Sequence, residues 1–474
     1  MRSLLVLFAI APTVFAADTV AKPVSFYRDV RPIFVTHCQG CHQPAKAQGK
    51  YVMTDFASLL KAGESEKTAI TPGKPEASYL LDELKIKEGK AKMPKNRDAL
   101  NPLQIETITK WVAAGAIDDT PATAKAPAID TEHPPVYNAA PVITSLAYSK
   151  DGSMIAVTGY HEVLLHKADG SGLVGRLVGL SERVQSLAFS PDGLWLAVAG
   201  GSPGQFGEIQ IWNVAKQKLK LAAPLTFDTV YGISWSPDGS ILAVGCADNT
   251  VRAIDADTGK QVLQMGTHSD WAVGTVFSRD GVHLVSVARD MTMKLTDVAT
   301  ERFVDNITSI TPGALKGGLM AVDRRPKTVQ ELQKVPEDTK GAKPMVYDEL
   351  IIAGSDGTPR LYKMHRETPR KIGDDANRIR VYKPLPGRVS SIKFDTDGSR
   401  FAASSSLDGK GEVRVYDTDS GAMVECEGIT GPIYAVAWSP DGKQIASGGF
   451  DGTVWLHDAA TGEVVKKFEV APKK

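Results

Sequence analysis

Two thiols and an imidazole stand close together in the order Cys38, Cys41, His42. In this C-x-x-C-H spacing the two cysteines can bond the vinyl groups of one haem as thioethers. The adjoining histidine can then reach the haem iron as its proximal ligand. The motif therefore predicts one covalently attached haem c, held by Cys38 and Cys41, with His42 as an axial ligand of the iron.

Two other kinds of chemistry also use closely spaced cysteines. A structural zinc site needs two further ligands at a suitable spacing, and the next cysteine in the chain is Cys246. A redox-active dithiol of the thioredoxin type belongs to a βαβ unit, which the flanking sequence does not show. Haem attachment is therefore the preferred interpretation, and a redox dithiol and a metal site are its alternatives.

A small helical frame is needed to position these residues. Apolar residues recur with helical spacing over residues 26–36, which lead directly into Cys38, and over residues 103–112, after which Gly115 can end the helix. Residues 24–117 resemble a class I cytochrome c, and in particular the planctomycete-type cytochrome c domain, in the strings FYRDVRPIF, CQGCH, LLKAGES, MPK and ITKWVAAGAI. The resemblance implies a small all-α domain with the haem between two terminal helices.

The same resemblance points to a second axial ligand. Met93, which precedes Pro94, stands where a class I cytochrome carries its axial methionine. Two strong ligands close the iron and favour electron transfer over gas or peroxide chemistry. Met53 and His37 are the competitors. We expect Met53 to pack on the haem as a core residue, and His37, on the helix before Cys38, to be unable to reach the opposite haem face easily.

Basic residues gather around Met93 in the sequence. They are Lys85, Lys87, Lys90, Lys92, Lys95 and Arg97. One interpretation is a solvated loop. The other is that these charges surround the exposed haem edge and steer it towards an acidic face of a redox partner.

The first residues of the chain predict export. Residues 1–16 contain one arginine, an apolar run and the small-residue ending Val-Phe-Ala, which is the pattern of a secretory signal peptide. The run is too short to cross a bilayer, so we expect a periplasmic protein without a transmembrane anchor. The chain has 55 basic and 55 acidic residues, and this balance argues against a nucleic-acid partner.

Residues 118–135 are rich in Pro, Ala, Thr and Asp and are predicted to be a linker. An internal repeat follows over residues 136–474. Its copies are alternating strands that end in a turn, as in VQSLAFSPDG, VYGISWSPDG and IYAVAWSPDG, and their turn glycines are Gly152, Gly193, Gly239, Gly281, Gly398 and Gly442. The one wide interval, from Gly281 to Gly398, holds two periods and an insertion. A period of about 43 residues with four strands indicates a β-propeller.

A second signature gives the number of blades. An aspartate follows four of the turn glycines, nine residues later in DNTVRAID, DMTMKLTD and DGTVWLHD and ten residues later at Asp408, and SDGTPRLYK repeats it at Asp356 inside the wide interval. Seven blades result. Residues 136–474 resemble the WD-repeat β-propeller family, although the terminal Trp-Asp dipeptide is mostly replaced. The resemblance makes His268 and Asp290 a structural pair, with His268 a packing residue.

The fold class predicted is therefore multidomain, with a small all-α cytochrome c domain followed by an all-β seven-bladed propeller. Two functions are consistent with it. The first is a periplasmic electron carrier whose propeller is a docking platform for other proteins. The second is an oxidoreductase in which the propeller binds a small substrate and passes electrons to the haem. No paired carboxylates or nucleophile motif stand out in the propeller, and we favour the carrier.

Overall fold

The computed structural model describes residues 23–86, 91–95, 97–121, 129–311, 313–327, 348–371 and 373–471. The predicted signal peptide, Lys87, Lys90 and most of the predicted insertion lie outside the described residues.

The first part of the chain is mainly helical. Its elements are η1 (Phe26–Val30), α1 (Arg31–His37), β1 (His42–Gln43), β2 (Lys46–Ala47), η2 (Gln48–Lys50), α2 (Phe56–Leu59), η3 (Pro75–Ala77), α3 (Tyr79–Leu84) and α4 (Pro102–Ala113). The all-α architecture expected from the resemblance is found only in part, because β1 and β2 pair as a short antiparallel hairpin immediately after the C-x-x-C-H motif.

Local sequence explains where the helices begin. Asn101 caps α4 by accepting a hydrogen bond from the backbone of Gln104, whose side chain bonds back to the backbone of Asn101. Pro102 is the first residue of α4, where its missing N–H costs nothing. The apolar face of α4 packs on η1, with the rings of Phe26 and Trp111 stacked 5.2 Å apart. This contact builds the core that lies beneath Cys38.

The rest of the chain forms seven antiparallel blades, which we number in chain order. Blades one and two share β6 and together form one seven-stranded sheet, and each later blade is a separate four-stranded sheet. Blades one and two contain β3 (Leu146–Tyr148), β4 (Met154–Thr158), β5 (Tyr160–Lys167), β6 (Leu173–Phe189), β7 (Trp195–Ser202), β8 (Phe206–Asn213) and β9 (Lys218–Thr226). The expectation of seven four-stranded blades is confirmed.

The remaining strands follow in the same order, four to a blade. Blades three and four contain β10 (Val230–Trp235), β11 (Ile241–Cys246), β12 (Val251–Asp255), β13 (Gln261–Met265), β14 (Ala272–Phe277), β15 (His283–Ala288), β16 (Met293–Asp297) and β17 (Arg302–Asn306). Blades five to seven contain β18 (Leu319–Arg324), β19 (Glu349–Gly354), β20 (Arg360–Lys363), β21 (Arg378–Val381), β22 (Arg388–Phe394), β23 (Arg400–Leu407), β24 (Lys410–Asp417), β25 (Met423–Glu425), β26 (Ile433–Trp438), β27 (Gln444–Gly449), β28 (Thr453–Asp458) and β29 (Val464–Glu469).

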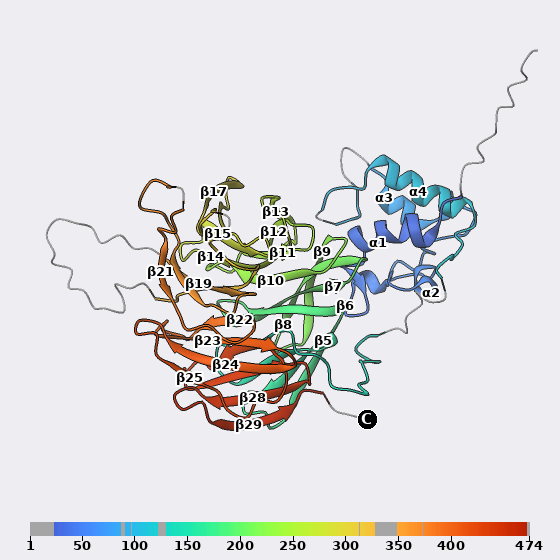
Figure 1. Cartoon of the computed structure of the whole chain (residues 1–474). Coiled ribbons are helices and arrows are strands. Elements are labelled where there is room, and N and C mark those ends of the chain that lie inside the picture. Colours follow the sequence, from blue (N-terminus) through green and yellow to red (C-terminus); the bar gives the residue numbers. More distant parts are fainter. Residues whose placement is uncertain are drawn as a thin grey trace, which may run out of the picture.

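Five copies of the repeated turn share a hydrogen bond from a serine hydroxyl to the aspartate two residues later, whereas the copy in blade six has Asp395 in place of the serine. In blade three the Ser236 hydroxyl donates to Asp238 at 2.5 Å, and Gly239 adopts a φ of 74°. Only glycine takes this left-handed conformation without strain, which accounts for the glycine at the end of each copy. The ring closes where the backbone N–H of Ile143 donates to Gly449 of blade seven at 2.8 Å. Figure 1 shows the blades around a common centre, with the helices beside blade two.

Candidate haem-binding site

The C-x-x-C-H motif begins at the C-terminal end of helix α1. The backbone N–H groups of Cys38 and Gln39 both bond to the carbonyl of Phe34, which ends the helix, and the N–H groups of Cys41 and His42 then bond to the carbonyl of Cys38. The motif is therefore a tight turn at the end of α1. This turn places both thiols and the imidazole next to one cavity.

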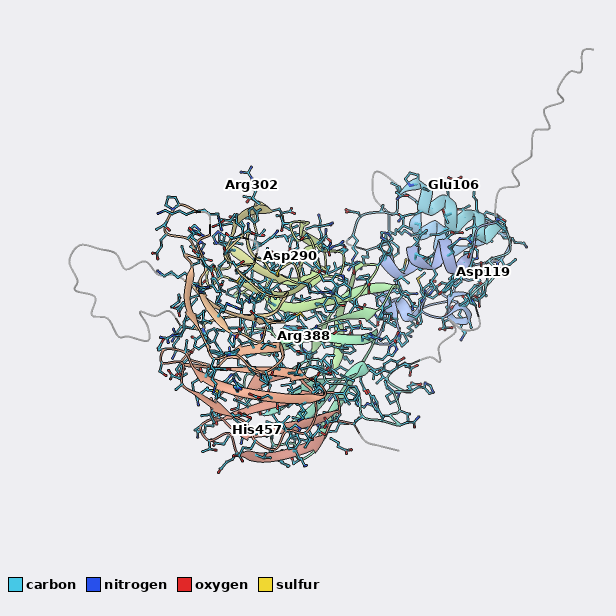
Figure 2. All side chains as sticks on the ribbon, viewed as in Figure 1. Glu106, Asp119, Asp290, Arg302, Arg388 and His457 are labelled. Atoms are coloured by element: carbon cyan, nitrogen blue, oxygen red, sulfur yellow. The ribbon has the colours of Figure 1, made fainter. Side chains whose placement is uncertain are left out.

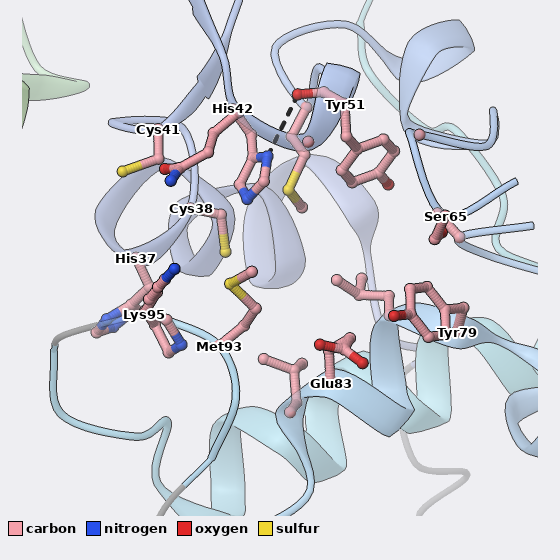
Figure 3. A pocket seen from close by; sticks show the side chains of 18 of the residues that line it. His37, Cys38, Cys41, His42, Tyr51, Ser65, Tyr79, Glu83, Met93 and Lys95 are labelled. Carbon is pink, nitrogen blue, oxygen red and sulfur yellow. Dashed lines mark hydrogen bonds between the residues drawn. The ribbon is translucent and has the colours of Figure 1, made fainter. Parts of the chain in front are cut away.

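A cavity of about 350 Å³ is lined by all four predicted site residues. Its wall includes Cys38, Cys41, His42, Met93, His37, Met53, Tyr51, Tyr79, Leu80, Leu84 and Arg97. Figure 3 shows the Cys38 sulfur, the His42 ring and the Met93 side chain pointing into the same space. The fold thus brings Met93 to the attachment motif across a large sequence separation.

The His42 ring is held in one orientation by the backbone. Its Nδ1 lies 3.3 Å from the carbonyl oxygen of Tyr51. A carbonyl can only accept a hydrogen bond, so Nδ1 carries the proton and Nε2 keeps its lone pair. Burial lowers the pKa of His42, which favours the neutral imidazole that binds metals. A metal-binding histidine commonly donates its other nitrogen to a carbonyl in this way.

The two cysteines are not bonded to each other. Burial, reinforced by the neighbouring Cys41, raises the pKa of the Cys38 thiol to about 12. Cys38 is therefore a protonated thiol in the apoprotein rather than an activated nucleophile. A reactive dithiol instead lowers the pKa of one of its thiols.

Met53 and Met93 reach the cavity from different segments. The backbone N–H of Met53 bonds to the carbonyl of His42 at 2.9 Å, whereas that of Met93 bonds to the carbonyl of Glu83 in α3 at 3.0 Å. Met53 is therefore tied to the His42 side of the cavity, and its side chain is almost fully buried in the core. His37 is engaged elsewhere, because Gln104 of α4 donates to its Nε2 at 3.1 Å.

Arg97 lines the cavity, and the sequence analysis did not distinguish it from the lysines near it. Its Nη2 atom is buried and has no hydrogen-bond partner within the described part of the chain. A buried donor of this kind needs an acceptor, and a carboxylate is the partner that best suits a guanidinium. Tyr51 was also missed, because its contribution to the site is a backbone carbonyl, which no side-chain motif reveals.

Two of the basic residues near Met93 form ion pairs with acidic residues of the same domain. Lys85 pairs with Asp82 at 2.6 Å, and Lys92 pairs with Glu83 at 3.0 Å. Lys95 lines the cavity and is exposed. Lys87 and Lys90 lie outside the described residues. The steering hypothesis therefore depends mainly on Lys95 among the lysines that the structure describes.

Asp290, labelled in Figure 2, lies in the propeller and pairs with His268. His268 Nδ1 is 3.0 Å from Asp290, and its Nε2 is 2.8 Å from the Ser286 hydroxyl. Both side chains are nearly inaccessible to solvent. These contacts fix one loop of blade four and leave no ring nitrogen of His268 unengaged, as the packing interpretation requires.

Two kinds of feature are absent from the residues that the structure describes. No group of three or more His, Cys, Asp or Glu side chains in the described ranges is arranged to hold a metal ion. In that same part of the chain no helix is long and apolar enough to cross a membrane.

Comparison with known families supports both halves of the architecture. Residues 38–97 match the family model "Planctomycete cytochrome C", which implies a haem c-binding domain. Residues 172–204 and 423–458 match "WD domain, G-beta repeat", and residues 209–276 match "Anaphase-promoting complex subunit 4 WD40 domain".

The similar curated proteins differ in how much of their length is matched. A guanine nucleotide-binding protein subunit beta of Arabidopsis thaliana is 25% identical over 304 residues, which is 61% of this chain and 72% of that protein. The periodic tryptophan protein 2 homolog of Caenorhabditis elegans is 22% identical over 38% of this chain, and only 20% of its own length is covered. The family matches show that this chain joins a cytochrome c domain of the planctomycete type to a WD-repeat domain.

Proposed function

We propose that the protein is an exported, periplasmic cytochrome with one haem c that transfers electrons, and that its propeller is a docking platform for other proteins. The observation that carries this proposal is the convergence of Cys38, Cys41, His42 and Met93 on one cavity. The first three are the attachment and proximal residues of a c-type haem, and a methionine completes the ligand set of an electron-transfer haem.

The residues around the cavity fit this group by their chemistry. Cys38 and Cys41 would hold it covalently, and His42 and Met93 would bind the iron. Arg97 offers a buried donor without a partner, which suits the carboxylate groups that haem carries. When bound, the group supplies a centre that gains and loses one electron.

The chain's own contribution is orientation and exclusion of water. The Tyr51 carbonyl fixes the ring of His42, and the Glu83 carbonyl fixes the backbone of Met93. Apolar side chains such as Leu80 and Leu84 line the wall between them. A ligand set held in this way changes little between the two redox states, which favours rapid electron transfer over chemistry at the iron.

The expected redox partner carries an acidic docking face, because Lys95 and its basic neighbours lie beside the cavity. Other proteins would bind the propeller, as the WD40 match suggests. Periplasmic localisation rests on the signal pattern of residues 1–16. The balanced net charge is the reason for expecting no nucleic-acid partner.

The test is to express the full chain, leader included, in a bacterium that matures c-type cytochromes and to isolate the periplasm. We expect haem that stays with the polypeptide on a denaturing gel, at one haem per chain, and a one-electron redox titration. A haem-free periplasmic protein, or retention of the protein in the cytoplasm, would contradict the proposal.

A second candidate function is favoured by one observation in the propeller. A cavity of about 680 Å³ lies at its centre, lined by Tyr231, Asp270, Trp271, Arg289 and Arg388 among others. A small substrate could bind there and pass electrons to the haem. The ultraviolet-visible spectrum separates the two functions, because absorbance beyond one low-spin c haem would favour this oxidoreductase.

A further inference from the structure

Blade two of the propeller lies directly against the haem-attachment segment. Figure 1 shows α1 beside β9. Lys46 of β2 donates through Nζ to the carbonyl of Lys220 in β9 at 2.5 Å. Arg31 of α1 donates to the Gln205 side chain of the β7–β8 turn at 3.0 Å. Ala45 packs on the core that blades one and two share.

The backbone of the C-x-x-C-H motif itself comes close to the propeller at Gly40. A Cβ atom added to Gly40 would lie only 2.3 Å from the carbonyl oxygen of Ala222 in β9. Gly40 is not among the glycines with positive φ, so its own backbone does not require glycine. The missing side chain is needed because the propeller backbone occupies that space.

The two residues between the cysteines therefore face different neighbours. The Gln39 amide donates to the Met53 carbonyl at 2.8 Å within the helical domain, whereas Gly40 is buried against the propeller. The spacer of the attachment motif is thus shaped partly by another domain.

Blade three reaches the same side of the cavity through Arg97. The Nη2 atom of Arg97 lies 2.9 Å from the position of a Cβ on Gly259. Gly259 belongs to the turn between β12 and β13. Arg97, which lines the cavity, is therefore packed between the cavity and the propeller.

Within the described part of the chain, the propeller does not cover the other side of the cavity. Glu64, Ser65 and Lys67 line the cavity and are exposed. Figure 3 shows Ser65 and Tyr79 across the cavity from Cys41 and His37. These residues, together with the exposed Lys95, border the part of the cavity that reaches solvent.

We propose that blades two and three cover the haem cavity where the C-x-x-C-H motif contacts the propeller at Gly40, so that electrons enter and leave through the rest of its rim, where Ser65 and Lys95 are exposed. The route of the electrons rests on the proposed function, whereas the seating of Gly40 on β9 does not. The propeller thereby has a role within the chain in addition to binding other proteins.

The test uses the full chain with a protease site inserted between Pro121 and Ile129. After cleavage, the wild-type pieces should co-elute on size exclusion, and amide exchange in residues 38–46 and 218–226 should be slow. Gly40→Ala should lose the co-elution and the protection, because its methyl group cannot fit against Ala222. Gly172→Ala is the matched control, since its Cβ would meet open space at ordinary φ.

A second measurement on the uncleaved proteins tests the covering role. Oxidation of the reduced protein by ferricyanide, which takes one electron, should be faster in Gly40→Ala than in Gly172→Ala because a second side of the cavity is opened. Lys46→Met combined with Arg31→Met should weaken co-elution without altering the attachment motif.

The outcomes separate the two proposals. Wild-type pieces that separate after cleavage, or a Gly40→Ala protein that behaves like the wild type, would overturn the cover. Gly40→Ala pieces that separate after cleavage, while the uncleaved Gly40→Ala protein is oxidised no faster than Gly172→Ala, would overturn the effect of the cover on electron exchange. The wild-type protein could lack covalent haem while its pieces still co-elute. That result would refute the proposed function but would agree with the proposed contact between Gly40 and β9.

Discussion

His42 and Tyr51 are joined by a hydrogen bond of 3.3 Å from Nδ1 to the backbone carbonyl. This bond selects one tautomer of His42 and leaves Nε2 as the free nitrogen. The Tyr51 carbonyl is held in turn, because the Tyr51 hydroxyl donates to the carbonyl of Leu59 at 2.6 Å. The proximal ligand of the proposed haem is therefore oriented by residues of the apoprotein.

Replacing both Cys38 and Cys41 with Ala should abolish covalent haem while the propeller stays folded, because the two domains have separate core clusters. Haem stain on a denaturing gel gives the first result and the circular dichroism of the strands the second. The matched control is Cys246→Ala with Cys426→Ala, which removes two buried thiols far from the motif. Haem stain in the Cys38/Cys41 variant would refute attachment at these residues.

Replacing Met93 with Ala should open the sixth iron position and lower the reduction potential, since a thioether ligand raises it. The readouts are the methionine-to-iron charge-transfer band of the oxidised protein and binding of cyanide or imidazole. Met53→Leu keeps the core filled and should leave the band intact. If the band is lost in Met53→Leu and kept in Met93→Ala, the assignment of the ligand is reversed.

If basic residues beside the cavity steer an acidic partner, Lys92→Glu with Lys95→Glu should slow association and flatten its dependence on salt. The physical reason is that such attraction acts over a Debye length of about 8 Å at physiological ionic strength. Lys443→Glu with Lys466→Glu changes the net charge equally on blade seven and is the control. Stopped-flow reduction by an acidic redox protein at several ionic strengths gives the slopes. Equal slopes for the two variants would favour the solvated-loop interpretation.

The Asp290 carboxylate should stabilise the propeller at neutral pH. Burial opposes its ionisation, but hydrogen bonds from His268, Thr292 and the Ser269 backbone outweigh burial and lower the pKa of Asp290. Asp290→Ala should cost about 1–3 kcal/mol in the free energy of unfolding, the usual cost of leaving buried groups unpaired. Chemical denaturation at pH 7 measures this cost, with the exposed Asp408→Asn as control.

The same carboxylate has a defined pH dependence. Because its folded pKa is depressed, its contribution is complete above the unfolded value of about 3.9 and is lost as the pH falls through the folded value. The stability difference between wild type and Asp290→Ala should therefore shrink on acidification below about pH 4. A difference that stays constant down to pH 2 would contradict the role assigned to ionised Asp290.

The sequence by itself determined the features that depend on local spacing. The Cys38–His42 motif predicted haem chemistry because two thiols for covalent attachment and one imidazole for the iron stand at a short and specific spacing. The turn glycines, such as Gly239, predicted the blades because each requires a left-handed backbone that recurs with one period. The hairpin of β1 and β2 was missed because strands of two residues carry no periodicity to detect.

Only the tertiary structure decided which distant residues meet. The buried Nη2 of Arg97 separates it from the lysines around it, and the Tyr51 carbonyl orients His42 through a backbone atom that has no side-chain signature. Gly40 could be read from the sequence only as a spacer between two cysteines. Its contact with Ala222 depends on how the two domains pack. No local sequence pattern predicts such a contact, because it depends on the complementary shapes of two surfaces that are far apart in the chain.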